Sequence, residues 1–113
     1  MGDDVISIDE ENRILSLAKY ERSLYEAIVQ RKERTELLKV AIKICQIMLR
    51  IPEWDTAEEI ARHRVNAIQK YEKAKDLEVI GEKELSEAYY KESQQNFRAY
   101  LLAIKNYLRD KKV

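Results

Sequence analysis

The chain of 113 residues has one Cys, one Pro and two Gly, and these shortages exclude several classes of small domain. A single Cys cannot form a disulfide within the chain, which excludes a disulfide-stapled secreted domain. An all-β fold needs many tight turns, and so few Gly and Pro residues cannot supply them. No apolar run approaches the roughly 18 residues of a membrane span, and we expect no signal peptide. What remains is a helical domain, which we expect to be cytoplasmic.

An excess of charge of one sign is also missing, because 21 Lys and Arg residues balance 21 Asp and Glu residues. A nucleic-acid-binding domain is usually basic, and a disordered chain would contain fewer than the 45% hydrophobic residues found here. Interspersed charges of both signs are typical of a solvated helical surface. A composition rich in charge and poor in Gly also fits a thermophilic source.

Apolar residues recur at spacings of three and four along most of the chain, which predicts amphipathic helices. Pro52 and Gly81 are the internal helix breakers, and the polar residues 30–36 favour a third turn. The alternative is a continuous rod of about 43 residues, roughly 65 Å long, which a small domain cannot cover. We therefore predict one domain over residues 1–113, an all-α antiparallel bundle whose four helices span residues 8–32, 36–51, 56–80 and 83–110.

Polar residues at the predicted boundaries fit helix caps. Gly81 is placed to end the third helix as its C′ residue, and residues 1–6 are expected to fray. Ser7 lies three residues before Glu10, which is the spacing of a capping box. The residues predicted to cap the starts of the second and third helices are Thr35 and either Asp55 or Thr56.

Two predicted helices carry unusually wide apolar surfaces. The helix over residues 36–51 is apolar on nearly every side, which predicts a buried central element. The helix over residues 83–110 has two neighbouring apolar stripes that together span about 200°. It either fills a groove between two helices or leaves one stripe for a partner. The second stripe is our candidate for the surface that binds this partner. It includes Phe97, Leu101, Ile104 and Leu108.

The residue types needed for catalysis are scarce, so we predict that the chain is not an enzyme and binds no cofactor or metal. His63 is the only His, and no second metal-ligating motif accompanies it. Cys45 lies on the apolar helix, where a thiol behaves as a small hydrophobe. No Gly-rich phosphate loop is present. Trp54 is expected to close one end of the bundle beside Pro52; the alternative is an exposed anchor at an interface.

Residues 38–77 resemble the last two helices of MIT domains. The resemblance is carried by Leu38–Leu49, a short loop and then Ile60–Leu77, with its Ala, Ile and Tyr residues at matching helical positions. MIT domains occur on ESCRT-associated ATPases and bind short helical tails of filament-forming partners. The resemblance implies a binding groove along the third helix, near Arg64, Ile68, Tyr71 and Lys75.

These observations favour a non-enzymatic interaction module that binds a partner helix, or a second copy of itself, through an apolar helix face. The alternative is a small nucleic-acid-associated subunit of a viral or defence complex, since the chain contains seven Tyr and two clusters of basic residues. The first cluster is Arg31, Lys32, Arg34, Lys39 and Lys43, and the second is Arg98, Lys105, Arg109, Lys111 and Lys112.

Overall fold

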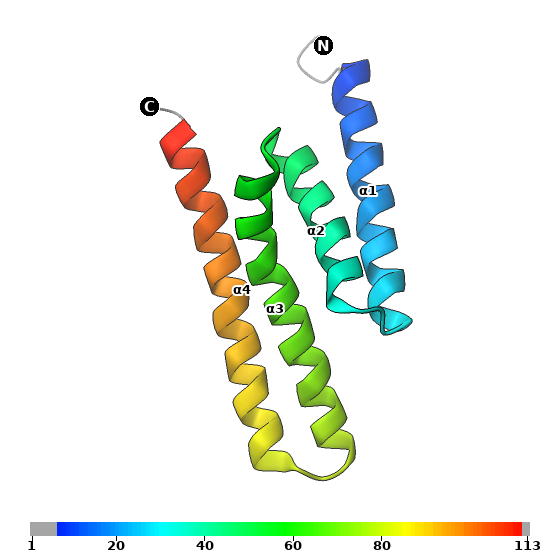
Figure 1. Cartoon of the computed structure of the whole chain (residues 1–113), viewed down its shortest axis with the longest axis vertical. Helices are drawn as coiled ribbons and strands as arrows, with labels where there is room; N and C mark the ends of the chain where they lie inside the picture. Colours follow the sequence, from blue (N-terminus) through cyan, green and yellow to red (C-terminus); the bar gives the residue numbers. More distant parts are fainter. Residues whose placement is uncertain (1–6, 112–113) are drawn as a thin grey trace, which may run out of the picture.

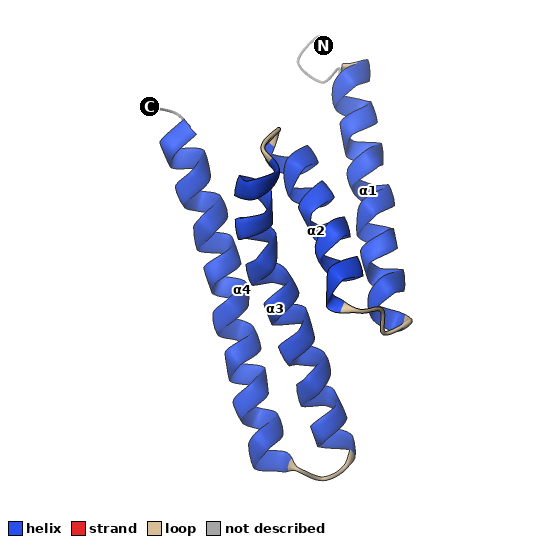
Figure 2. Cartoon of the chain, in the orientation of Figure 1, coloured by secondary structure: helices blue, strands red, loops and turns tan. Residues whose placement is uncertain are grey.

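The computed structural model describes residues 7–111; residues 1–6, which we expected to fray, and the basic residue Lys112 lie outside this range. The described part of the chain forms four helices and no strand: α1 (Ile8–Val29), α2 (Arg34–Leu49), α3 (Trp54–Val79) and α4 (Lys83–Lys111). Successive helices run in opposite directions, and the main packing contacts join consecutive helices (Figures 1 and 2). The predicted all-α antiparallel bundle is confirmed, and the chain turns between α1 and α2 instead of continuing as a rod.

One of the predicted N-caps is confirmed and the others are wrong. The Ser7 hydroxyl accepts a hydrogen bond from the backbone N–H of Glu10 at 3.1 Å. The caps of α2 and α3 are Glu33 and Glu53 rather than Thr35 and Asp55 or Thr56. The carbonyls of Glu33 and Glu53 accept the first helical hydrogen bonds, so both helices begin earlier than predicted. Neither cap side chain bonds the backbone, and because these ends are exposed, water can satisfy the first N–H groups.

Three of the helices end in the same backbone turn, with a residue of positive φ just after the last helical turn. Gly81 fills this position after α3, at φ 87°, as predicted. After α1 and α2 the residue is instead Arg31 (φ 54°) or Arg50 (φ 55°). The next N–H in each case bonds a carbonyl five residues back, for example Glu82 to Leu77 at 2.9 Å.

Exchanging residues at these turns should change stability in opposite directions. A side chain disfavours positive φ, and a Cβ added at Gly81 meets no atom within 4 Å, so Gly81→Ala should cost about 1 kcal/mol through backbone conformation alone. Arg50→Gly should stabilise the fold by about 0.5 kcal/mol, because the ion pair that Arg50 forms within residues 7–111, with Glu10, is on the surface and contributes little. Urea unfolding of the two variants tests this; a loss of stability in both would contradict it.

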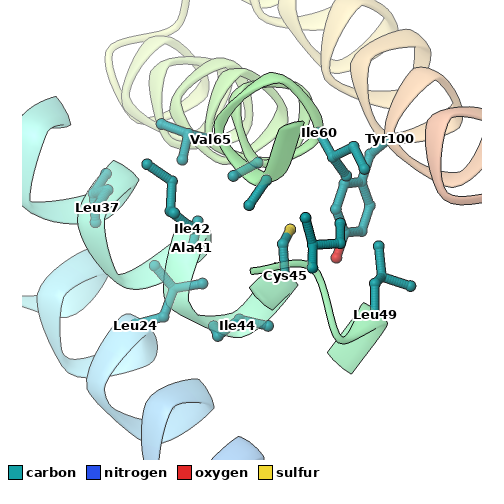
Figure 3. Packing of buried hydrophobic residues seen from close by; sticks show 13 residues of the cluster. Leu24, Leu37, Ala41, Ile42, Ile44, Cys45, Leu49, Ile60, Val65 and Tyr100 are labelled. Atoms are coloured by element: carbon teal, nitrogen blue, oxygen red, sulfur yellow. The ribbon is translucent and has the colours of Figure 1, made fainter. Parts of the chain in front are cut away.

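The hydrophobic core lies between α2 and α3 and receives Tyr100 from α4 (Figure 3). Six of its thirteen residues come from α2, so the predicted central role of this helix is confirmed, although Lys39 and Lys43 keep one side of it in solvent. α3 is equally central, because it packs against both α2 and α4. The prediction that Trp54 closes the end of the bundle is wrong: Trp54 is half exposed, and buried Ile51 contributes to the core there.

Small side chains hold α3 and α4 close together. The Ser86 hydroxyl donates to the carbonyl of Ala74 at 2.8 Å, and the Ser93 hydroxyl donates to the carbonyl of Ala67 at 2.7 Å. All four residues are buried. The two Ser residues are seven residues apart on α4, and the two Ala residues are seven apart on α3, which is about two turns in each helix. The line of α4 that faces α3 therefore runs through Ser86, Ser93 and Tyr100. Most of the second apolar stripe, including Phe97 and Leu101, remains exposed.

The helices differ in length, and this leaves part of α3 uncovered. At 1.5 Å per residue, the 16 residues of α2 span about 24 Å, whereas the 26 residues of α3 span about 39 Å. Figure 1 shows the α3–α4 hairpin extending past the turn between α1 and α2. The C-terminal half of α3 consequently lacks α2 as a neighbour, and an open groove forms beside it.

Candidate functional site

The open groove is bounded by the C-terminal part of α1, by α3 and by the middle of α4, and its volume is about 780 Å³. Ile68 and Tyr71 line it from α3, Tyr25 and Ile28 line it from α1, which we call the α1 wall, and further residues line it from α4. We call this surface the α1/α3/α4 groove. The remaining lining residues are Ala67, Glu72, Lys75, Ser93, Gln94, Phe97, Arg98 and Leu101.

The groove is apolar and open to solvent at the same time. Phe97 is 47% exposed and Leu101 is 49% exposed. The Tyr71 ring packs edge-on against Tyr90, with 5.4 Å between ring centroids, and the Lys75 ammonium lies 5.5 Å from the Tyr71 centroid. Large side chains held in place but left half exposed are typical of surfaces that bind another macromolecule.

The structure brings five of the eight predicted site residues together in the groove: Ile68, Tyr71, Lys75, Phe97 and Leu101. The other three do not line it. Ile104 packs partly buried against the core, and Leu108 is exposed near the end of α4. Arg64 serves as a structural bridge, because its guanidinium forms two hydrogen bonds, of 2.7 and 2.8 Å, with the Glu21 carboxylate of α1.

Two ion pairs link α1 and the turn after it to α3 beside the groove. Besides Arg64 and Glu21, Arg31 after α1 forms two hydrogen bonds, of 2.9 and 2.8 Å, with Asp76 of α3. The Arg31 guanidinium lowers the pKa of the Asp76 carboxyl. The two pairs lie at separate points along α3 and are the main links between α1 and α3, because α1 packs chiefly on α2. Within the first basic cluster, the charge of Arg31 is therefore compensated by Asp76, whereas Arg34 bonds the neutral side chain of Gln69 at 2.7 Å.

Behind the groove, the core contains a thiol and a phenol close to Arg64. The Arg64 guanidinium lies 5.9 Å from the centroid of the Tyr100 ring, and the ring reaches from α4 toward Cys45 (Figure 3). Burial raises the pKa of the Cys45 thiol to about 11. Burial, together with the nearby thiol, raises the pKa of the Tyr100 hydroxyl to about 12. Both groups are neutral at ordinary pH, and a neutral buried thiol is a poor nucleophile.

Alkaline pH should destabilise the fold through Cys45. The unfolded chain releases the thiol proton near its ordinary pKa of 9.0, whereas the folded chain retains it to about pH 11. The unfolded state is therefore favoured as pH rises through this interval, and stability should fall by about 1 kcal/mol between about pH 8 and pH 10. Urea unfolding of wild type and Cys45→Ala measures the effect, which should be smaller in the variant. An equal fall in both proteins would assign it to other groups.

The α1 wall is the part of the groove that the sequence analysis missed. Tyr25 and Ile28 lie on the same stripe of α1 as the residues that pack on α2, and the sequence alone does not divide that stripe between two neighbours. Ser93 was missed because a Ser does not stand out in a helical pattern, although its spacing of seven from Ser86 and Tyr100 is a weak signal.

Comparison of the chain with protein-family models, curated proteins and solved structures finds no match. The resemblance to MIT domains therefore stays a prediction. Within residues 7–111, no group of three or more His, Cys, Asp and Glu side chains is arranged to hold a metal ion. No helix of the described chain combines the length and the apolar character needed to cross a bilayer.

Proposed function

We propose that the chain is a non-enzymatic interaction module that binds an α-helix of a partner protein in the α1/α3/α4 groove. The observation that carries the proposal is the half-exposed apolar surface of Phe97, Leu101 and Tyr71 between walls formed by three helices. An amphipathic helix buries its apolar face in such a groove through residues at positions i, i+3, i+4 and i+7.

The dimensions of the groove support a helix of two to three turns as its occupant. Along α4 the lining runs from Ser93 to Leu101, and along α3 from Ala67 to Lys75. Both stretches contain nine residues, or about 13 Å of helix. A bound helix of about three turns has similar length and presents three or four apolar anchors on one side.

Selection of binding helices tests the proposal without knowledge of the natural partner. A display library of helices about 20 residues long, with a fixed apolar stripe and variable flanking positions, is selected against the whole chain. The proposal predicts enriched helices that bind the purified protein in fluorescence anisotropy. The control is a library in which Ser replaces the apolar stripe. The proposal is contradicted if no helix binds more strongly than the background that this control library sets.

A second copy of the chain is the competing occupant of the groove. Size-exclusion chromatography with light scattering, at two protein and two salt concentrations, distinguishes the two cases. A monomer supports the partner helix. If the wild-type chain is a dimer and Leu101→Glu converts it to a monomer, then a second copy of the chain occupies the groove, and the proposal of a partner helix is wrong.

A further inference from the structure

α4 carries a basic face that borders the α1/α3/α4 groove. Lys91, Arg98 and Lys105 follow one another at steps of seven residues, which places them on nearly the same side of the helix. All three side chains are exposed, and none of them takes part in an ion pair within the described chain. Arg98 itself lines the groove.

The charge on this face is local, because the whole chain has no net charge. From Ser93 to the end of α4 at Lys111 there are four basic residues, and Asp110 is the only acidic one. The other two charged residues that line the groove, Glu72 and Lys75, compensate each other. Lys75 pairs with Glu72 at 3.6 Å, and Arg64 is held by Glu21. Arg98 is therefore left as the uncompensated charge of the groove lining.

We propose that the partner helix is acidic, with carboxylates beside its apolar stripe that meet Arg98 and Lys105 while the stripe covers Phe97 and Leu101. This inference rests on the proposed function. A helix that lies in the groove runs nearly along α4, so the two carboxylates are expected about two turns apart, matching the seven residues between Arg98 and Lys105. Complementary charge at the rim of an interface sets its orientation and speeds association more than it adds affinity.

The surroundings of the basic face favour an acidic helix over a nucleic acid. Phe97 and Leu101 border Arg98 directly, and these apolar side chains suit the apolar stripe of a helix better than a phosphate backbone. The first part of α4 carries Glu84, Glu87 and Glu92, which would repel an extended polyanion that followed the helix. A short helix that meets only Arg98 and Lys105 avoids these carboxylates.

The charge of selected helices provides the test. Helices are selected from the library described above, in which each flanking position is Glu, Lys, Ser or Gln. The proposal predicts enrichment of Glu at positions seven residues apart. Arg98→Glu and Lys105→Glu should each weaken binding of an enriched helix by about 3- to 10-fold and reduce its salt dependence. The matched control is Lys39→Glu, a reversal of an exposed charge on α2 away from the groove, and it should leave binding unchanged.

Exchange of charge between the two partners gives the strictest outcome. A helix with Lys in place of the enriched Glu residues should bind Arg98→Glu more tightly than it binds wild type. Helices that lose binding with Leu101→Glu but show no preference for Glu and no response to Arg98→Glu would overturn the acidic partner and leave the proposed function standing. If no helix is enriched, the proposed function itself fails. Binding of a single-stranded or duplex oligonucleotide at low salt, lost in Arg98→Glu, would overturn the acidic helix in favour of a nucleic acid.

Discussion

Leu24→Ala should lower the free energy of unfolding by about 3 kcal/mol, because Leu24 is the only fully buried side chain that α1 contributes to the core. Leu24 is 1% exposed, and it is among the largest side chains that are fully buried. Its truncation removes apolar contacts and leaves a cavity where α1 packs on the core. The melting temperature should fall by more than about 10 °C for a domain of this size.

Tyr25→Ala is the matched control for this substitution. Tyr25 is the next residue of α1 but is 67% exposed, so its truncation should change stability by less than about 0.5 kcal/mol. In Leu24→Ala, the rates of amide hydrogen exchange should also increase more in α1 than in the α3–α4 hairpin. The reason is that α1 loses its anchor in the core, while Ser86 and Ser93 still join α4 to α3. Equal stability of the two variants would contradict the packing described for α1.

Leu101→Glu should weaken binding of a selected helix by about 100-fold and leave the fold intact. A carboxylate in the middle of the apolar lining faces the apolar stripe of the bound helix, and truncation or charging of a central anchor commonly removes 2 kcal/mol or more, which is about 30-fold or greater. Because half of the Leu101 side chain is already in solvent, the free energy of unfolding should change by less than about 1 kcal/mol.

Leu102→Glu separates a specific effect from a general effect of added charge. Leu102 is 56% exposed, close to the exposure of Leu101, but it points about 100° away around α4 and does not line the groove. Anisotropy titrations should therefore show wild-type affinity for Leu102→Glu. If Leu101→Glu abolishes the circular dichroism signal of the helices, then the stripe is core and the groove is not a docking surface.

Sequence patterns were sufficient to predict the four helices and the turns between them. Pro52 and Gly81 break the helical pattern whatever surrounds them, and the polar residues 30–33 end α1 because nothing buries them. The exact helix starts were not predictable in this way. Glu33 and Glu53 begin helices without a bonding side chain, so no residue type marks those positions.

The composition of the groove was only half predictable, because it depends on which helices are neighbours. The exposed stripe of α4 was visible as an excess of apolar surface, and Phe97 and Leu101 follow from it. The line that packs on α3 passes instead through Ser86 and Ser93, which carry no apolar signal. The α1 wall depends on how α1 packs on α2 and meets α3, for example through Arg64 and Glu21, residues 43 positions apart, and a single sequence does not reveal such neighbours.

The central claim is that the α1/α3/α4 groove is a binding surface for a helix, and the location of a bound helix on the protein tests it most directly. Amide chemical-shift mapping of the isotope-labelled chain, titrated with a selected helix, provides that location. The account predicts the largest changes around Tyr25, Ile68, Tyr71, Phe97 and Leu101, and none along the outer side of α2 at Lys39 and Lys43. Changes confined to α2, or to the exposed tip of the α3–α4 hairpin at Val79 and Ile80, would contradict it.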